Sequence, residues 1–149
     1  MMRLILAAAH LLALGIGLGA VWARSRALRG EVQPADVRRA LVADTWWGVA
    51  AALWLVTGLW RLFGETEKGT DYYFTNHAFL LKMGLFVVIL LLEVSPMATL
   101  IRWRQELSKG RVPSLDRAGR MSTISAIEAA IVVAMVGAAV TMARGLGGG

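Results

Sequence analysis

Four long apolar stretches, separated by charged segments, dominate the sequence. They cover roughly residues 4–23, 41–63, 76–103 and 121–144. Each is long enough to cross a bilayer as a helix, since about 20 apolar residues span the ~30 Å hydrocarbon core. The first stretch is longer than the roughly 7–15 residues of a signal-peptide core, so we interpret it as a retained span. The pattern predicts an all-α fold, a four-helix transmembrane bundle that forms a single domain over residues 1–149.

The composition agrees with this class of protein. Hydrophobic residues make up 57% of the chain, and the net charge is +6. The basic residues gather in short loops between the apolar stretches, so the charge predicts membrane topology and not binding to nucleic acid. The chain has no cysteine, which excludes disulfides, thiolate metal sites, iron–sulfur clusters and covalent c-type haem attachment.

The loops differ in the sign of their charge. Residues 24–40 and 102–120 are rich in arginine, whereas the loop at residues 64–76 has three acidic residues and one lysine. Basic loops remain on the cytoplasmic side of a membrane. We therefore expect both termini outside, in a multi-pass protein of the bacterial inner membrane.

Four tryptophans fall in the second apolar stretch. Trp46, Trp47 and Trp60 lie near its ends, where aromatic side chains anchor helices at the headgroup level. Trp54 lies too deep for such a belt, and we expect it to pack in the core.

His10 is an ionisable residue inside the first apolar stretch. Such residues are costly in hydrocarbon and usually face the interior of a bundle. Ala13, Leu14 and Gly17 lie on the same helical face as His10. Along this face the side chains become small, which leaves space beside the imidazole. One interpretation is a site for a large flat cofactor, haem b. The other is close helix packing through small residues, with His10 hydrogen-bonded to a neighbouring helix.

Three further residues are predicted to lie near His10. The first and third spans run in the same direction, and helical rise places His10 and Lys82 about 9 Å inside the same face of the membrane. His77 and Arg61 lie near that face as well. His10 and His77 would ligate haem iron, while Lys82 and Arg61 would pair with the propionates.

The second axial position has two candidates. His77 and Lys82 are five residues apart, so they point about 140° away from each other on one helix. Either residue, but not both, faces the centre of the bundle. We rank His77 first because neutral imidazole is the usual ligand.

A second group of ionisable residues lies toward the opposite face. It comprises Asp44, Glu93 and Glu128, with Arg24 and Arg102 nearby. Buried carboxylates either pair with cations or take up protons. These residues therefore form ion pairs that lock helices together, or a proton path that continues from the haem zone.

Two segments of the chain have a family resemblance, AAAHLLALGIGLGAVWARSRALRG and WGVAAALWLVTGLWRLFGETEKGTDYYFTNHAFLLKMGLF. The chain resembles an uncharacterised family of predicted bacterial four-helix membrane proteins over nearly its whole length. More distantly, it is similar to HemJ-type protoporphyrinogen oxidases and CopD-like membrane domains. In HemJ-type proteins a His early in the first span holds haem b, and a Lys lies near the start of the third. His10 and Lys82 fall at corresponding places.

Two functions remain open. The first is a membrane b-type haem protein with a redox role, either HemJ-like porphyrinogen oxidation or quinone-linked electron transfer, with a porphyrin or a quinone as its partner in the lipid bilayer. The alternative is a non-enzymatic assembly subunit or a CopD-like metal-handling subunit. Either would work as a homo-oligomer or within a larger membrane complex.

Overall fold

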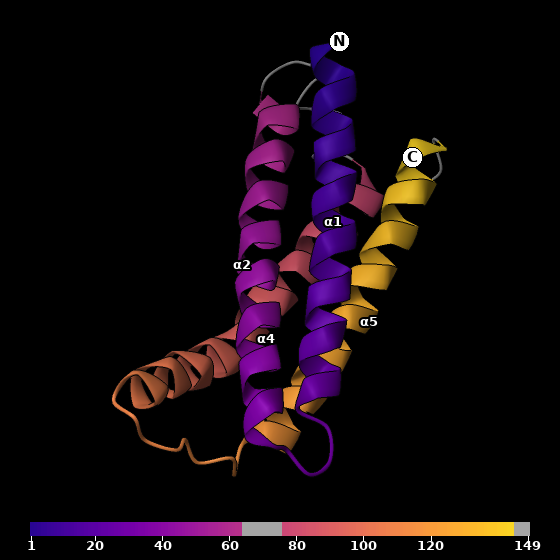
Figure 1. Cartoon of the computed structure of the whole chain (residues 1–149). Helices are drawn as coiled ribbons and strands as arrows, with labels where there is room; N and C mark the ends of the chain where they lie inside the picture. Colours follow the sequence, from indigo (N-terminus) through magenta and orange to yellow (C-terminus); the bar gives the residue numbers. More distant parts are fainter. Residues whose placement is uncertain (64–75, 145–149) are drawn as a thin grey trace.

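The structure is a computed structural model that describes residues 1–63 and 76–144. Its helices are α1 (Met2–Ala27), α2 (Pro34–Phe63), α4 (His77–Ser108) and α5 (Ala118–Ala143). All four are long and apolar enough to cross a membrane. Figure 1 shows that α1 begins and α5 ends at the same end of the bundle. The predicted four-helix fold is therefore confirmed, while the acidic loop that we used for the orientation lies outside the described residues.

Local sequence signals account for two of the helix starts. Pro34 is the first residue of α2, where its missing N–H and fixed φ cost nothing. Asp36 accepts a hydrogen bond from the Gln33 backbone N–H at 3.0 Å. Asn76 caps α4, because its side-chain oxygen accepts from the backbone N–H groups of the second and third helical residues at 3.0 and 3.2 Å, as N-cap residues do.

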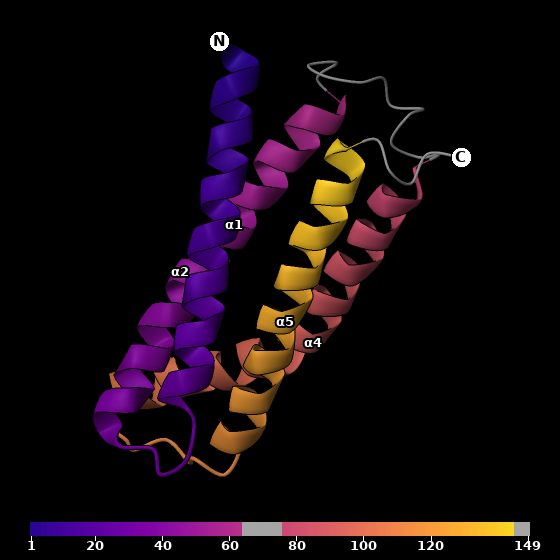
Figure 2. The same cartoon turned by 90° about the vertical axis from the view of Figure 1, so that its right-hand side faces the viewer.

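The four helices do not contact one another equally. α1 packs against α2 and α5, and α5 packs against α4, while α2 and α4 scarcely meet. Figure 2 shows α5 between α1 and α4. The bundle is consequently open on the side between α2 and α4, and two cavities lie there.

Helix α4 changes direction along its length, so that its last part runs across the base of α2 (Figures 1 and 2). Pro96 lies inside this helix, and a proline ring removes a backbone donor and clashes with the preceding turn. The bend brings Leu100 and Trp103 into a second apolar core with Leu28 and Val37. Trp103 Nε1 donates to a backbone carbonyl of the α4–α5 loop at 3.0 Å.

The tryptophans of α2 divide between lipid and core. Trp46 and Trp60 are exposed on the surface of the bundle, as expected for residues that meet lipid. Trp54 is buried, which confirms its predicted core position. The prediction for Trp47 was wrong: it is buried against Gly17 of α1, because this turn of α2 faces α1.

Candidate functional site

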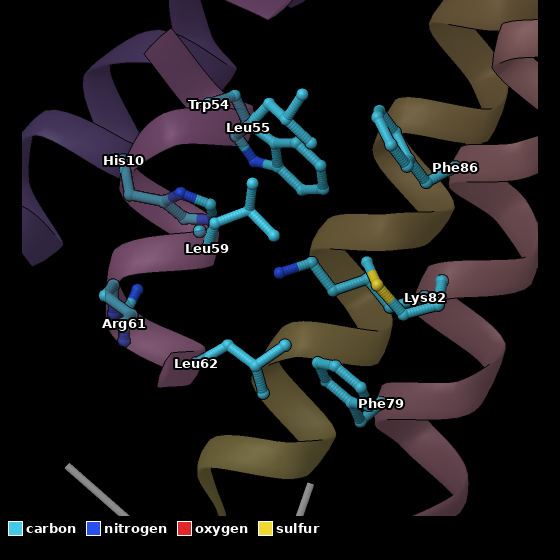
Figure 3. Close-up of a pocket in the computed structure, with 11 residues that line it drawn as sticks. His10, Trp54, Leu55, Leu59, Arg61, Leu62, Phe79, Lys82 and Phe86 are labelled. Carbon is cyan, nitrogen blue, oxygen red and sulfur yellow. The ribbon is translucent and has the colours of Figure 1, made fainter. Parts of the chain in front are cut away.

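A cavity of about 110 Å³ opens between α2 and α4, toward the end of the bundle where α1 begins. Its wall includes His10 from α1, Trp54 and Arg61 from α2, and Lys82 and Phe86 from α4. Figure 3 shows the Lys82 amine extending across the cavity from α4 toward the α2 side. The cavity thus has three basic residues in an otherwise apolar and aromatic wall.

His10 is held by α2. It is 6% exposed, and its Nδ1 lies 2.9 Å from Thr57 Oγ1. The Thr57 hydroxyl has one hydrogen, which it donates to the Leu53 backbone carbonyl at 2.7 Å. Thr57 therefore accepts from His10, which places the proton on Nδ1 and the lone pair on Nε2. This is the arrangement of a metal-ligating histidine, whose second ring nitrogen donates to a neighbouring oxygen.

Trp54 is the centre of an aromatic group. The His10 ring stacks on it with centroids 5.0 Å apart and an interplanar angle of 24°. Phe86 packs against it at 4.9 Å, and Lys82 Nζ lies 4.9 Å from its ring centroid, within cation–π range. The buried Trp54 Nε1–H has no acceptor in the part of the chain that the structure describes. An indole donor of this kind is one that a ligand oxygen would satisfy.

Two residues of this site were missed by sequence reasoning. Thr57 was one, although it follows Trp54 by three residues and so shares its helical face. Gly58 was the other: a Cβ there would lie 3.3 Å from His10 Cε1. The glycine therefore lets α2 approach the imidazole closely.

The structure brings together three of the five predicted cofactor residues. His10, Arg61 and Lys82 line the cavity. His77 does not line it; it is the exposed first residue of α4. Gly17 lies farther along α1, where a Cβ would meet Trp47 Cζ3 at 3.3 Å. The space beside this glycine is filled by α2, as close helix packing requires.

A second cavity, of about 220 Å³, continues along the same opening. It shares Trp54 and Phe86 with the first cavity and reaches Asp44 and Glu93 at its far end. The wall between these ends is apolar, with residues such as Ile89. The two polar zones therefore lie along one opening, with an apolar stretch between them.

Arg24 is the centre of the second polar zone and is fully buried. Its Nε donates to Ser125 Oγ at 2.9 Å, and its Nη1 donates to Asp44 Oδ1 at 2.9 Å. Glu93 takes two parallel bonds, from Nη1 and Nη2, each at 2.7 Å. Nη2 also donates to Glu128 Oε2 at 2.7 Å. Arg24 thus uses all five of its N–H donors and connects all four helices.

The arginines of this zone differ from those that we expected. Arg24 was predicted to flank the carboxylates in a loop, but it lies in the last turn of α1, at the centre of the cluster. Arg102 is exposed. Arg104 instead approaches from α4 and donates to Asp44 Oδ2 at 2.7 Å, because the bend of α4 carries this residue over the base of α2. Among the described residues, no group of three His, Asp or Glu side chains is arranged to hold a metal ion.

Comparison with known proteins gives the family. The model of a family described as "Predicted membrane protein (DUF2214)" matches residues 2–147. The chain belongs to this family. No curated protein and no solved structure matches it. In this DUF2214 protein, the His10 cavity and the Arg24 cluster both lie within the matched residues.

Proposed function

We propose that this protein binds b-type haem in the membrane and has a redox role, with His10 as the residue that would hold the iron. The observation that supports this most directly is the Thr57 hydrogen bond, since it directs the lone pair of a buried imidazole to Nε2. Bound haem would supply one-electron redox chemistry. The protein would supply the ligand, its orientation and the apolar surroundings.

The other polar groups of the cavity suit an anionic, flat ligand. Lys82 and Arg61 line the same space as His10, and cations of this kind pair with propionates. Trp54 Nε1 would donate to a propionate or to a quinone carbonyl. Since Lys82 lines the cavity and His77 does not, we now favour Lys82 over His77 as the partner of His10 in holding the group.

Admission of a porphyrin requires the opening to widen. The cavity of about 110 Å³ is smaller than the roughly 300–1,000 Å³ of most small-molecule sites. Few contacts join α2 and α4, and the hydrogen bonds from Arg104 to α2 lie at the opposite end of the bundle from the His10 cavity. Separation of the two helices around this cavity would therefore break few contacts, and a ligand dissolved in the bilayer would enter there. The donor residues therefore fit haem, and the required space lies along the least tightly packed side of the bundle.

The remaining parts of the proposal concern reaction and location. A hydrophobic reductant in the bilayer, a porphyrinogen or a quinol, would approach through the same lateral opening, and the protein would act within a homo-oligomer or a larger complex. The protein would lie in the bacterial inner membrane, with its basic loops in the cytoplasm, because basic and acidic loops alternate along the chain.

The absorption spectrum of the protein purified from haem-replete cells tests the proposal. We expect a Soret band that His10→Ala abolishes and that His77→Ala leaves unchanged. Lys82→Met should weaken haem binding or shift the band. His77→Ala is the matched control, because it removes the second histidine of the chain, which does not line the cavity. Absence of a Soret band from the unmodified protein would contradict the proposal and leave an assembly subunit, in which Arg24 and its partners fix the helices, as the better account.

A further inference from the structure

The cluster around Arg24 has more acidic groups than basic ones. Asp44, Glu93 and Glu128 contribute three carboxyl groups, whereas Arg24 and Arg104 contribute two guanidinium groups. Among the described residues, Arg24 is the only basic side chain that pairs with Glu128. If every group were ionised, a net negative charge would remain inside the bundle. Charge buried without a partner is very costly, and such a group binds a proton instead.

The three carboxyl groups are not equally well paired. Both oxygens of Glu93 accept from Arg24, at 2.7 Å each. Asp44 accepts from Arg24 through Oδ1 and from Arg104 through Oδ2. Paired oxygens of this kind stabilise the ionised carboxylate. These two side chains are also 17% and 18% exposed, so some solvent reaches them.

Glu128 differs from both. Its side chain is 0% exposed. Its Oε2 accepts from Arg24 Nη2, but its Oε1 is buried and has no hydrogen-bond partner among the described residues. Arg24 cannot supply one, because all five of its N–H groups donate elsewhere. In an ionised Glu128, Oε1 would be a charged acceptor without a donor, whereas a neutral carboxyl group would leave only a neutral polar atom there, at much lower cost.

We infer that Glu128 is a proton-binding site in the core of the membrane bundle, with the proton on Oε1. Oε2 then acts as the carbonyl oxygen that accepts from Arg24, while Glu93 and Asp44 remain ionised and neutralise Arg24 and Arg104. A metal cation would fit this position poorly, because the Arg24 guanidinium already occupies the other side of the carboxyl group. The inference does not depend on haem.

Infrared spectroscopy and thermal unfolding of the whole protein in micelles test this assignment. At neutral pH, exposed carboxyl groups are ionised, so the carbonyl band of a protonated carboxylic acid reports a buried one. We expect the unmodified protein to show this band and Glu128→Gln to lose it. Gln is nearly isosteric with a neutral Glu, so Glu128→Gln should keep the melting temperature of the unmodified protein.

Glu93→Gln and Glu31→Gln are the matched controls. Glu93→Gln removes the two-oxygen ion pair with Arg24, so it should lower the melting temperature clearly. Because it also removes the excess of carboxyl groups over guanidinium groups, it should weaken the acid band as Glu128 ionises. Glu31 is exposed in the α1–α2 loop, and its replacement should change neither measurement. The assignment is overturned if the unmodified protein lacks the band, if Glu128→Gln retains it, or if Glu128→Gln destabilises or unfolds the protein as Glu93→Gln does.

Discussion

At the scale of single residues, the buried polar groups of α1 determine both polar zones. His10 and Arg24 are fourteen residues apart, and the positions between them at Ala13, Gly17 and Ala20 are also buried. The spacing alternates between three and four residues, so all five lie on one face of the helix. The helical rise separates the two polar residues by about 21 Å along α1. One face of one helix thus presents an imidazole at one end and a guanidinium at the other.

Replacement of Thr57 tests how His10 is held. Thr57→Val keeps the shape of the side chain but leaves His10 Nδ1–H, buried in the bundle, without its acceptor. We expect the free energy of unfolding to fall by about 1–3 kcal/mol, the usual cost of an unsatisfied buried group. If haem binds, its affinity should fall by about 10–100-fold.

Thr123→Val is the control for this prediction. Thr123 is exposed, and its hydroxyl donates to a carbonyl of its own helix at 3.1 Å. Its replacement should change the free energy of unfolding by less than about 0.5 kcal/mol. Denaturant titration in mixed micelles measures both variants. Equal effects in the two would show that the His10 hydrogen bond contributes nothing specific.

At the scale of helices, small residues of α1 set how closely α2 approaches. At Gly17 a Cβ would lie 3.3 Å from Trp47 Cζ3 and 3.4 Å from Ala50 Cβ. At Gly15 and Gly19 no heavy atom lies within 4 Å of the Cβ position. The three glycines are therefore not equivalent, and of these three only Gly17 is in close contact with α2.

Substitution by leucine at two glycines tests this difference. Gly17→Leu should push α1 away from α2 and lower the free energy of unfolding by about 1–3 kcal/mol, as overpacking does. Gly15→Leu places the same side chain in the same helix toward lipid, so it should have little effect. Unfolding in micelles compares the two variants, and a similar loss at Gly15 would show that helix propensity, not the α1–α2 contact, decides the outcome.

At the scale of the whole molecule, the arrangement of helices leaves one lateral opening. α1 packs against α2 and α5, and α5 packs against α4, while α2 and α4 stand apart and border both cavities. The even number of described spans brings the start of α1 and the end of α5 to the same end (Figure 1). The His10 cavity is near this end, and the Arg24 cluster lies toward the other.

The orientation of this bundle in the membrane can be measured with reporter fusions. We expect a reporter that is active only outside the cytoplasm to be active when fused at Gly149, because the positive-inside rule assigns the arginine-rich loops at residues 24–40 and 102–120 to the cytoplasm. The same reporter inserted in either of these loops should be inactive. Activity in the loops with none at Gly149 would reverse the orientation, and His10 would then lie near the cytoplasmic face.

The sequence by itself determined the four helices, their order and the depth of the polar residues. Hydropathy and helical rise are local properties of the chain, so they were sufficient to place His10, Lys82 and Arg61 near one end and the three acidic residues near the other. They also indicated that an ionisable residue of the first span would face inward.

Only the tertiary structure decided which side of each helix faces its neighbours. Lys82, and not His77, lies in the cavity wall, and Trp47 is buried. Arg24 lies among three carboxyl groups. The arginine that approaches these groups from α4 is Arg104 and not Arg102. The rotation of a helix about its axis depends on how it packs against other helices, and in spans that are apolar on nearly every face the hydrophobic pattern specifies that rotation weakly. The bend of α4 and the separation of α2 from α4 likewise arise from contacts between segments far apart in the sequence.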